Sequence, residues 1–420
     1  MDTKFKETKI GRIPEEWDAV QISKLGKVVT GSTPSTSVKE YWGKDVPFVT
    51  PTDIVNSKTL PHVERYLSYK GTTVSRMIPP NSICVTCIAS IGKICITKTP
   101  SVTNQQINSI LPDEKFDTEY LYYVIVHNRE RLNALAGFTT VPIVKKSSFE
   151  KFLVALPPLP EQHKIAEIIT TVDEAIEKTD TIIKETQQLK KGLMQKLFIE
   201  GIGHTRFRET KIGQIPEEWD TATLGEVLTN IQSGVSRNLS IIDIGVPVIR
   251  STNIKDNRLV LDDLRYWFWD DTQGVDLRNY ILDRGDILIN FINSVAQIGK
   301  CCIFSGQPRD FIFTTNIFRA KSNDELISNI YFLMFSETEA YQSQISSITK
   351  PAVNQASFTH GDFRKIKIPL PKKQEQDKIV NILSGVDAKI ETEQAYKTEL
   401  QRLKKGLMQV LLTGQVRVKI

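Results

Sequence analysis

Two long stretches of the chain carry apolar residues at helical spacing. In 161–198 they recur mostly every three or four residues and proline is absent, which is the pattern of an amphipathic helix with one apolar stripe. A second stretch near the C-terminus repeats this spacing. The stripes consist of Ile165, Ile169, Val172, Ile176, Ile183, Leu193 and Leu197, and of Ile379, Leu383, Val386, Ile390, Leu400, Leu407 and Leu411. We expect the two helices to pair as an intramolecular antiparallel coiled coil.

The sequence before each predicted helix consists of short β-branched runs separated by Pro, Gly, Asn and Ser, which is typical of strands joined by loops. Helical periodicity is confined there to two stretches that begin at Thr118 and Glu325. Each region has roughly 150–165 residues, enough to bury its own core. The predicted fold class is therefore α/β (α+β), with two similar mixed domains joined by two long helices.

An internal repeat underlies this organisation. FKETKIGRIPEEWD from Phe5 returns from Phe207 and is identical at all but two positions, with an offset of 207 − 5 = 202. LKKGLMQKLF from Leu189 returns from Leu403, again identical at all but two positions, with an offset of 403 − 189 = 214. Because a missed repeat leads to a wrong architecture, this similarity outweighs local signals. The repeat is also circular, since the closing TGQVRVKI resembles the start of the linker that follows the first helix, and we expect the termini to be adjacent.

The interiors of the two copies have diverged but keep matching segments. VPFVTPTDI at Val46 parallels VPVIRSTNI at Val246, and PIVKKSSF at Pro142 parallels PAVNQASF at Pro351. A common framework with different interiors is what two sites for different targets would require. Antiparallel helices would place the domains at opposite ends, related by an approximate two-fold axis, which matches the symmetry of duplex DNA. The predicted division is 1–155 (first domain), 156–200 (first helix), 201–367 (second domain) and 368–420 (second helix and tail).

Composition excludes several classes of protein. With 40% hydrophobic and 25% charged residues, the chain is neither disordered nor a membrane protein. The net charge of +5 is too small to establish a nucleic-acid partner. We expect the protein to be located in the cytoplasm, since the N-terminus lacks the apolar core of a signal peptide. The five cysteines lie in apolar runs and are expected to be reduced core residues, although Cys84 and Cys87 form a CxxC for which we also considered metal or redox use.

Catalytic motifs are not found in the sequence. A phosphate-binding loop, a nucleophile elbow, an HExxH pair and the [DNS]PP[YFW] loop of amine methyltransferases are all missing. The five histidines are scattered, and no metal site is predicted. This pattern favours recognition and scaffolding. Two alternatives stay open: a single-chain DNA-modifying or DNA-cleaving enzyme without recognisable motifs, and a coiled-coil adaptor that binds only proteins.

The chain resembles the specificity subunit of type I restriction-modification systems over essentially its whole length. The resemblance lies in the duplicated IGxIPEEW, the closing P-x-V-x-x-x-SF, the helix starts LPPLPEQHKI and LPKKQEQDKI, and LKKGLMQ before each helix end. It implies a non-catalytic subunit whose two target recognition domains each bind one half of a bipartite DNA site in the major groove. The helices would set the gap between the halves, so that an inserted heptad (~10 Å) would widen it by roughly three base pairs.

The resemblance also implies partners. Two methyltransferase subunits, which bind S-adenosylmethionine, would dock on the helices, and restriction subunits would add a nuclease that uses ATP and Mg²⁺. The framework residues expected to bind partners are Glu161, Gln162, Lys164, Lys190 and Lys191, and their counterparts Glu375, Gln376, Lys378, Lys404 and Lys405. Shared ancestry, or a role limited to the helix pair, would explain their recurrence equally well.

For DNA, basic residues are candidate phosphate ligands and loop amides, hydroxyls and arginine are candidate base contacts. The candidate phosphate ligands are Lys70, Arg76, Lys93, Lys98, Arg237, Arg250, Arg278 and Lys300. The candidate base contacts are Thr50, Thr52, Asp53, Asn104, Gln105 and Gln106 in the first domain, and Arg250, Ser251, Asn253, Asn290, Asn293 and Asn316 in the second. Each has an alternative role as a turn cap or a solvated charge. Trp17 and Trp219 are expected to anchor the core rather than to stack on bases.

Overall fold

The chain divides into two compact units. The computed structural model describes residues 4–55, 57–60, 62–136, 141–351 and 355–420, so 352–354 of the segment PAVNQASF lie outside the described residues. One unit consists of Met1–Thr181 and Gln394–Ile420, and the other of Ile182–Glu393. Each unit holds one α/β domain together with a part of both long helices. The four-part division made from the sequence stays a prediction.

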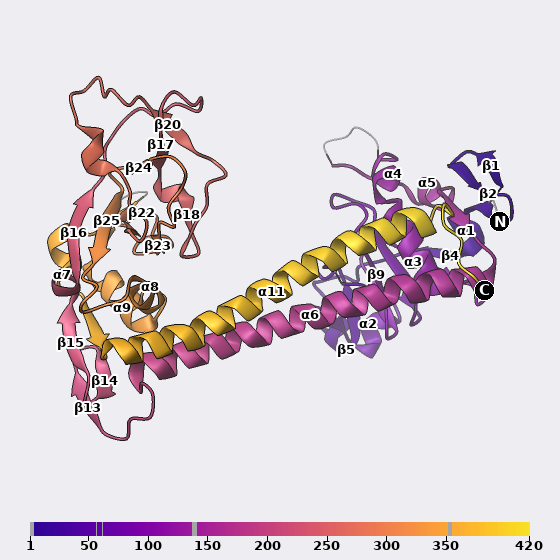
Figure 1. Cartoon of the computed structure of the whole chain (residues 1–420). Helices are drawn as coiled ribbons and strands as arrows, with labels where there is room; N and C mark the ends of the chain where they lie inside the picture. The colour runs from indigo at the N-terminus through magenta and orange to yellow at the C-terminus, as the bar shows by residue number, and fades with distance from the viewer. Residues whose placement is uncertain (1–3, 56, 61, 137–140, 352–354) are drawn as a thin grey trace. The chain divides into compact units, whose positions relative to one another are not determined.

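The two long helices are α6, Leu159–Ile199, and α11, Lys373–Leu411, drawn in magenta and yellow in Figure 1. Both predicted helices are thus confirmed. Pro160 occupies the second position of α6, where the missing N–H of proline costs no helical hydrogen bond. The proline-free stretch that follows lets the helix continue unbroken.

Ion pairs join the two helices within each unit. In the first unit Lys404 pairs with Asp173 and Lys397 with Asp180, each at 2.5 Å. A step of one heptad forward on α6 corresponds to a step of one heptad back on α11, so the helices run antiparallel there. In the second unit Lys190 pairs with Asp387 at 2.8 Å, which repeats the Lys404–Asp173 pair with the two helices exchanged.

The first domain is built on two four-stranded sheets, β4-β11-β8-β9 and β6-β5-β10-β7, with the short pairs β1-β2 and β12-β3 beside them. Strands β5 and β10 pair in parallel and the other pairs are antiparallel. The strands are β1 Phe5–Thr8, β2 Gly11–Pro14, β3 Asp18–Gln21, β4 Gly26–Thr30, β5 Trp42–Val49, β6 Arg65–Leu67, β7 Met77–Ile78, β8 Ile83–Thr86, β9 Ile94–Ile96, β10 Ser101–Thr103, β11 Ile107–Pro112 and β12 Leu153–Leu156.

The second domain repeats this order in β16-β25-β21-β23, β20-β17-β24, β13-β14 and β15-β28, and adds β18-β19 and β22-β27-β26. Its parallel pair is β17 and β24, the counterparts of β5 and β10. The strands are β13 Phe207–Thr210, β14 Gly213–Pro216, β15 Asp220–Thr223, β16 Leu228–Ser233, β17 Val246–Ile249, β18 Ile254–Lys255, β19 Arg258–Leu259, β20 Arg265–Trp267, β21 Ile287–Asn290, β22 Ile292–Asn293, β23 Cys301–Ile303, β24 Ile312–Phe313, β25 Ile317–Ser322, β26 Lys350–Pro351, β27 Ala356–Ser357 and β28 Lys367–Leu370.

Short helices cover the sheets. They are α1 Ile22–Leu25, α2 Tyr69–Thr72, α3 Thr118–His127, α4 Arg129–Asn133, α5 Lys146–Glu150, α7 Leu224–Val227, α8 Asn329–Phe335, α9 Glu339–Ile348 and α10 His360–Phe363, with 3-10 turns at Lys39–Tyr41, Ser251–Asn253 and Leu277–Tyr280. The two helical stretches expected from Thr118 and Glu325 each split in two. Asn128 ends α3, and its side-chain amide donates to the Val124 carbonyl at 2.7 Å. Thr338 caps α9 by accepting from the Tyr341 N–H.

One continuous core in each unit joins the domain to both long helices. In the first unit it runs from Trp17 through α3 to Ile165 of α6 and Leu411 of α11. In the second it runs from Trp219 through α8 to Leu197 of α6 and Ile379 of α11. Both tryptophans are buried, which confirms them as core anchors.

The five cysteines are free and buried, as expected for reduced core residues. Burial raises the pKa of the Cys87 thiol to about 11 and that of Cys301 to about 12. These thiols are therefore protonated near neutral pH and are poor nucleophiles.

Candidate functional site

A buried junction ties the first domain to α6 and to the C-terminus of the chain. The Trp17 indole donates from Nε1 to Glu161 Oε2 at 2.9 Å, and Glu161 is fully buried. Arg417 donates to both oxygens of the same carboxylate, at 2.6 and 2.9 Å, and also to Glu16 at 2.7 Å. These hydrogen bonds raise the pKa of Arg417. The C-terminal tail thus closes the first domain, which confirms that the repeat is circular.

The second domain has the same junction with a different cation. Trp219 Nε1 donates to Glu375 Oε2 at 3.0 Å, and His204 lies 2.9 Å from Oε1. Gly201 and Gly414 stand at equivalent places, both with positive φ. A side chain at Gly201 would collide with Trp219, and one at Gly414 would collide with Pro14. His204 and Arg417 do not stand out in the sequence; the signal that points to them is the similarity of TGQVRVKI to the linker after the first helix.

Gln162 and Gln376 bind the residues at the N-termini of α3 and α8. Gln162 Oε1 accepts from the Asp117 N–H and Gln376 Oε1 from the Ser328 N–H, both at 3.0 Å. The Nε2 groups donate to the carbonyls of the equivalent residues Pro157 and Pro371. Glu161, Gln162 and Gln376 are buried, so these framework residues serve intramolecular contacts.

The lysines expected to bind partners fall into two groups. Lys190 and Lys404 are the cross-helix cations described above, and Lys190 also pairs with Glu337 at 3.0 Å. The others are exposed: Lys164, which pairs with Glu167, Lys191, which pairs with Glu339, and Lys378 and Lys405.

Two equivalent grooves lie where the long helices meet the domains. The groove of the second unit encloses about 350 Å³ between α6, the β13-β14 hairpin and the α8-α9 turn. The groove of the first unit lies between α11, α6 and the α3-α4 turn. Their linings share five pairs of identical residues: Gln187 and Gln401, Lys190 and Lys404, Lys191 and Lys405, Met194 and Met408, and Gln195 and Gln409.

In the first domain the predicted base contacts converge on one edge. Because β5 and β10 are parallel, the loops that begin at Thr50 and Asn104 leave the sheet on the same side. The Asn104 N–H donates to the Val49 carbonyl at 3.0 Å, and Lys93 Nζ donates to the Pro51 carbonyl at 3.0 Å. We call this surface the first loop edge; it contains Thr50, Thr52, Asp53, Lys93, Asn104, Gln105 and Gln106.

Several of these side chains are engaged with one another. Asp53 accepts from the Thr50 hydroxyl at 2.7 Å and from the Glu64 N–H at 3.0 Å, so it caps a turn. Asn104 Nδ2 donates to Gln106 Oε1 at 3.0 Å. Thr52 and Gln105 are exposed at the surface of the edge.

The second domain forms an equivalent edge. The parallel pair β17 and β24 sends the loops at Arg250 and Thr314 to one side. Asn290 Nδ2 reaches the Ser251 carbonyl at 3.5 Å, the Asn290 N–H donates to the Lys300 carbonyl at 2.9 Å, and the Phe291 N–H donates to the Asn316 carbonyl at 3.2 Å. This second loop edge contains Arg250, Ser251, Asn253, Asn290, Asn293, Lys300 and Asn316.

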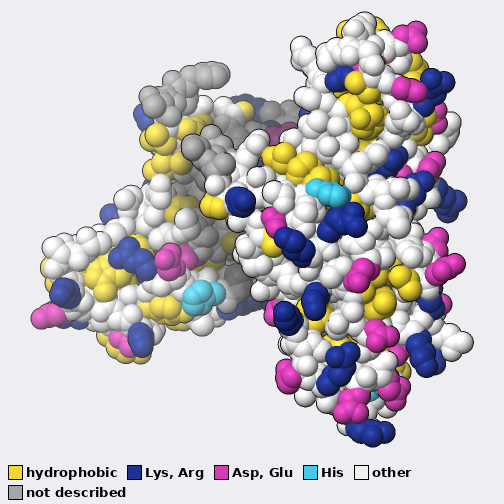
Figure 2. Space-filling model, turned by 90° about the vertical axis from the view of Figure 1, so that its left-hand side faces the viewer, with side chains coloured by type: hydrophobic (Ala, Val, Ile, Leu, Met, Phe, Trp, Pro, Cys, Tyr) yellow, Lys and Arg dark blue, Asp and Glu magenta, His cyan; other side chains and the backbone are white. Residues whose placement is uncertain are grey.

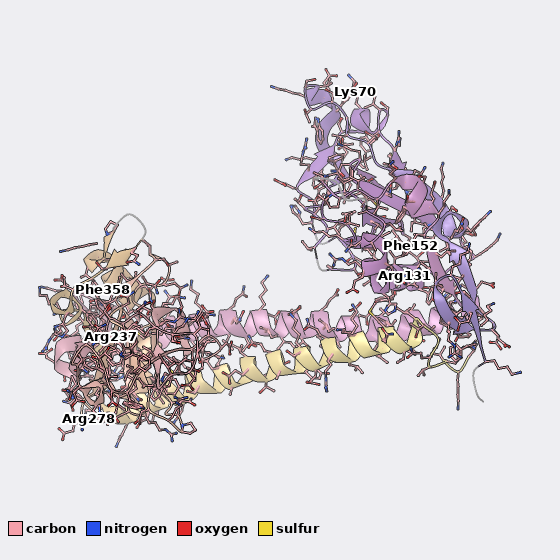
Figure 3. All side chains as sticks on the ribbon, turned by 90° about the horizontal axis from the view of Figure 1, so that it is seen from above. Lys70, Arg131, Phe152, Arg237, Arg278 and Phe358 are labelled. Carbon is pink, nitrogen blue, oxygen red and sulfur yellow. The ribbon has the colours of Figure 1, made fainter. Side chains whose placement is uncertain are left out.

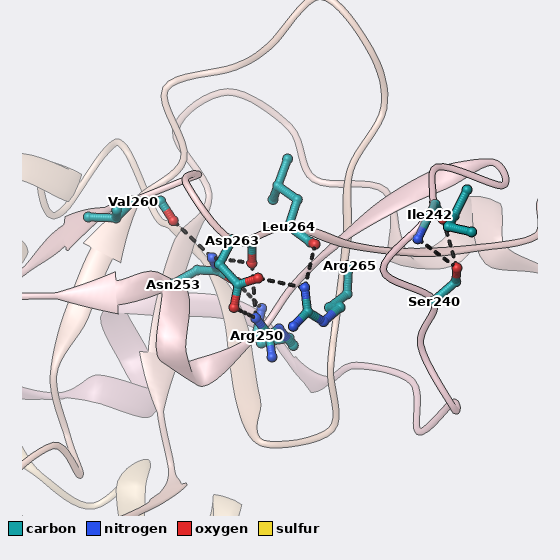
Figure 4. A network of polar contacts seen from close by, with 8 residues as sticks. All are labelled: Ser240, Ile242, Arg250, Asn253, Val260, Asp263, Leu264 and Arg265. Carbon is teal, nitrogen blue, oxygen red and sulfur yellow. Dashed lines mark hydrogen bonds and ion pairs between the residues drawn. The ribbon is translucent and has the colours of Figure 1, made fainter.

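Figure 4 shows that Arg250 and Asn253 belong to a polar network within the second domain. Arg250 donates to Asp263 Oδ2 at 2.6 Å, and Asn253 Nδ2 donates to the Val260 carbonyl at 2.9 Å. Arg265 binds the other oxygen of Asp263 at 2.5 Å. Among the described residues, Arg250 Nε and Asn290 Oδ1 are buried without a hydrogen-bond partner, and such atoms favour a ligand that supplies one.

Four other predicted phosphate ligands make contacts within their own domains. Lys70 of α2 pairs with Glu40, and Figure 3 places it at the far end of its domain from Arg131, which lies over Phe152. Arg76 donates to the Thr30 carbonyl at 2.9 Å. Lys98 lies in the loop between β9 and β10, near Glu119, and Arg278 pairs with Asp276 at 2.9 Å.

Arg237 forms a bidentate pair with Asp271 at 2.7 and 2.8 Å, and both side chains are almost completely buried. The Arg237 guanidinium holds the pKa of the Asp271 carboxyl well below its usual range. Because this pKa is depressed in the folded state, the pair stabilises the domain at neutral pH and loses that effect as the pH falls below the ordinary carboxyl range. The geometry therefore gives Arg237 a structural role.

We expect Arg237→Ala to lower the melting temperature of the second unit by several degrees, because it leaves the Asp271 carboxylate without its cation. Calorimetry of the full chain measures this. Arg278→Ala is the matched control, since Arg278 pairs with an aspartate at the exposed surface. An unchanged melting temperature for Arg237→Ala would contradict the structural role.

Charged side chains of both signs are mixed over the surface, as Figure 2 shows for the face that it presents. Within the described part of the chain, no three or more His, Cys, Asp and Glu side chains gather in a way that could hold a metal ion. The described helices include none that is both long and apolar enough to cross a membrane.

Duplicated domains, equivalent loop edges and a shared framework define a class of two-site recognition proteins. The family model for the type I restriction modification DNA specificity domain, Methylase_S, matches residues 14–188 and 216–402. The chain therefore belongs to the family of type I restriction-modification specificity subunits and carries two DNA specificity domains.

Known relatives agree. The type I restriction enzyme MjaVIII specificity subunit of Methanocaldococcus jannaschii is 28% identical over 436 residues, which cover 99% of this chain and 96% of that protein. The MjaIX specificity subunit of the same organism is 34% identical over 243 residues, 56% of each chain. The crystal structure of a type I S subunit from M. genitalium has the same fold, with a TM-score of 0.58, 16% identity and full coverage of both chains.

Proposed function

We propose that each loop edge binds one half of a bipartite DNA site, and that the two long helices set the gap between the halves. The observation that carries this proposal is the contrast between framework and edge. Both junctions use the same Trp–Glu pair, while the equivalent edges carry different side chains, such as Gln106 in one and Asn316 in the other. A scaffold that is constant and edges that differ suit two different target sequences.

The chemistry of the edges fits the major groove. Amide side chains suit adenine and arginine suits guanine. Arg250 Nε and Asn290 Oδ1 are a donor and an acceptor that a base edge or a bridging water would pair. Lys93 lies beside Pro51 at the first edge and Lys300 beside Asn290 at the second, where a phosphate backbone would pass.

Substitution at the first edge tests the assignment. We expect Gln105→Ala to weaken discrimination at one position of one half-site by about 1–3 kcal/mol, or roughly 5- to 150-fold, and to leave the other half-site unchanged. Asn293→Ala should act on the opposite half. The measurement is competition binding on DNA variants, with Lys70→Ala as the exposed control away from the edge. A loss spread over both half-sites after Gln105→Ala would refute the assignment.

We further propose that each groove receives one methyltransferase subunit. Two sites with five identical lining residues suit two copies of one partner. In this proposal the chain has no catalytic activity of its own. S-adenosylmethionine belongs to the methyltransferase subunits, and ATP and Mg²⁺ belong to restriction subunits that join the complex in the cytoplasm.

Stoichiometry tests the docking proposal. Gln195→Arg and Gln409→Arg each place a long charged side chain at the mouth of one groove. Both positions are exposed on a helix, so we expect the variants to fold normally. We expect each single variant to retain one methyltransferase subunit per chain and the double variant to retain none, measured by native mass spectrometry. Gln188→Arg is the control on the same helix. Two bound subunits in the double variant would rule out docking at the grooves.

A further inference from the structure

In both domains a cation from the loop region after the first strand of the parallel pair reaches one of the long helices. Lys58 Nζ lies 3.2 Å from Thr170 Oγ1 of α6 and 3.2 Å from Glu119 Oε1 of α3. Arg258 lies 2.7 Å from Glu391 Oε1 of α11. Each contact joins the domain to the helix that follows it in sequence.

The two cations occupy equivalent positions. The offset from Val46 to Lys58 is 58 − 46 = 12, and the offset from Val246 to Arg258 is 258 − 246 = 12, where the two valines begin the matching segments. The sequences around them differ, NSKTL in one copy and DNRLV in the other. A charge directed at the helix has therefore been kept in a region where the sequence diverged.

Hydrogen bonds to the neighbouring strand hold the backbone at or beside both cations. The Lys58 carbonyl accepts from the Ile96 N–H of β9 at 2.8 Å. Asp256 and Asn257 have φ of 47° and 57°, as in a tight two-residue hairpin turn, and Arg258 is the first residue after that turn. Asn257 Oδ1 accepts from the Cys301 N–H of β23, the counterpart of β9, at 3.3 Å.

The two contacts differ in their surroundings. The Lys58 side chain is 13% exposed and lies 5.7 Å from the centre of the Tyr123 ring. Tyr123 donates to Asp173 at 2.7 Å, and Asp173 pairs with Lys404, so Lys58 adjoins a network that spans both helices. The Arg258 side chain is 60% exposed, where an ion pair is weaker.

We propose that Lys58 and Arg258 are positioning residues that fix the angle of each recognition domain on its helix and so restrict the DNA site to one gap length. This inference rests on the proposed function. The Trp–Glu junction and the adjoining core attach each domain near the start of the helix that follows it. Lys58 and Arg258 add a contact further along that helix, from the region that follows β5 or β17 and its loop edge. A shift of ~3.4 Å at the loop edge corresponds to one base pair.

The test uses the chain in complex with its methyltransferase and a series of DNA duplexes with the same half-sites and gaps that differ by one base pair. Methylation rates give the preference for the native gap over its neighbours. We expect this preference to fall about tenfold for Lys58→Met, which removes the cation that pairs with the partly buried Glu119. It should fall about two- to fivefold for Arg258→Glu, as suits an exposed pair.

Two controls separate positioning from folding. Lys255→Ala, an exposed lysine on the same hairpin, should keep the gap preference of the wild type. Combining Arg258→Glu with Glu391→Arg restores an opposite-charge pair and should restore the preference. A role limited to stability would lower the rate at all gaps by the same factor.

An unchanged gap preference in both variants, or an equal loss at every gap, would overturn the inference. A wild-type complex without any gap preference would instead overturn the proposed function. The two failures are therefore distinguishable in one experiment.

Discussion

Exchange of the second domain's interior changes one half of the DNA target and leaves the other half and the assembly with partner subunits as they were. The exchange replaces the residues between Trp219 and Pro369 with the corresponding segment of a homologue. Strand β15 and the first half of β28 move together, so the pairs Ala222–Ile368 and Thr223–Lys367 are exchanged as a unit. The junction of Trp219, Glu375 and His204 stays in place.

The framework accepts such an exchange because it already holds two different interiors through the same contacts. Tyr120 donates to the Ala155 carbonyl at 2.9 Å in the first domain, and Tyr331 donates to the Pro369 carbonyl at 3.2 Å in the second. The five lining residues that the two grooves share all lie on the long helices, outside the exchanged segment, so methyltransferase stoichiometry should be unchanged. The methylated sequence before and after the exchange is the measurement, and a change in both halves would contradict separate recognition.

Glu161→Ala destabilises the first unit by about 3 kcal/mol, the lower end of the range for a broken buried ion pair, because Arg417 is still a quarter exposed. The substitution leaves the Trp17 indole N–H and the Arg417 guanidinium without their shared acceptor. Glu161→Gln keeps an acceptor for Trp17 and should cost less.

Chemical unfolding of the full chain measures this effect. Glu167→Ala is the control, since Glu167 lies on the exposed face of the same helix. Deletion of residues 416–420 should reproduce part of the loss, because it removes Arg417. Equal stability of Glu161→Ala and the wild type would show that the junction does not hold the domain.

The sequence alone predicts the architecture well, because apolar spacing and self-similarity are local signals. Both long helices and the circular repeat were accessible from residue patterns. The two helical stretches at Thr118 and Glu325 were found, but their breaks were not, since the breaks depend on individual caps such as that of Asn128.

The direction of a repeated side chain is less predictable. The repeated residues Glu161, Gln162 and Gln376 were predicted to contact partners, but their side chains are buried within the chain. A residue that recurs in both copies is under a structural or functional constraint, and the sequence does not say whether its contacts are inside the protein or with a partner. Lys58 and Arg258 could not be identified from the sequence, because the helix residues that they contact lie far away along the chain. The docking of partners on the exposed lysines stays a prediction.

The loop edges illustrate the same limit. Thr50 and Asn104 are far apart in the sequence, and only the parallel pairing of β5 with β10 brings them together. Short strands give no sequence signal for such pairing. The polar loop residues could be identified from the sequence. That they lie together at one edge of a sheet could be seen only in the structure.

Methylation of a random-sequence DNA library by the complex of this chain with its methyltransferase tests the central claim most directly. Two recognition domains on one helical spacer predict two constant half-sites separated by a degenerate gap of one fixed length. A single uninterrupted motif, or methylation without sequence preference, would contradict the account.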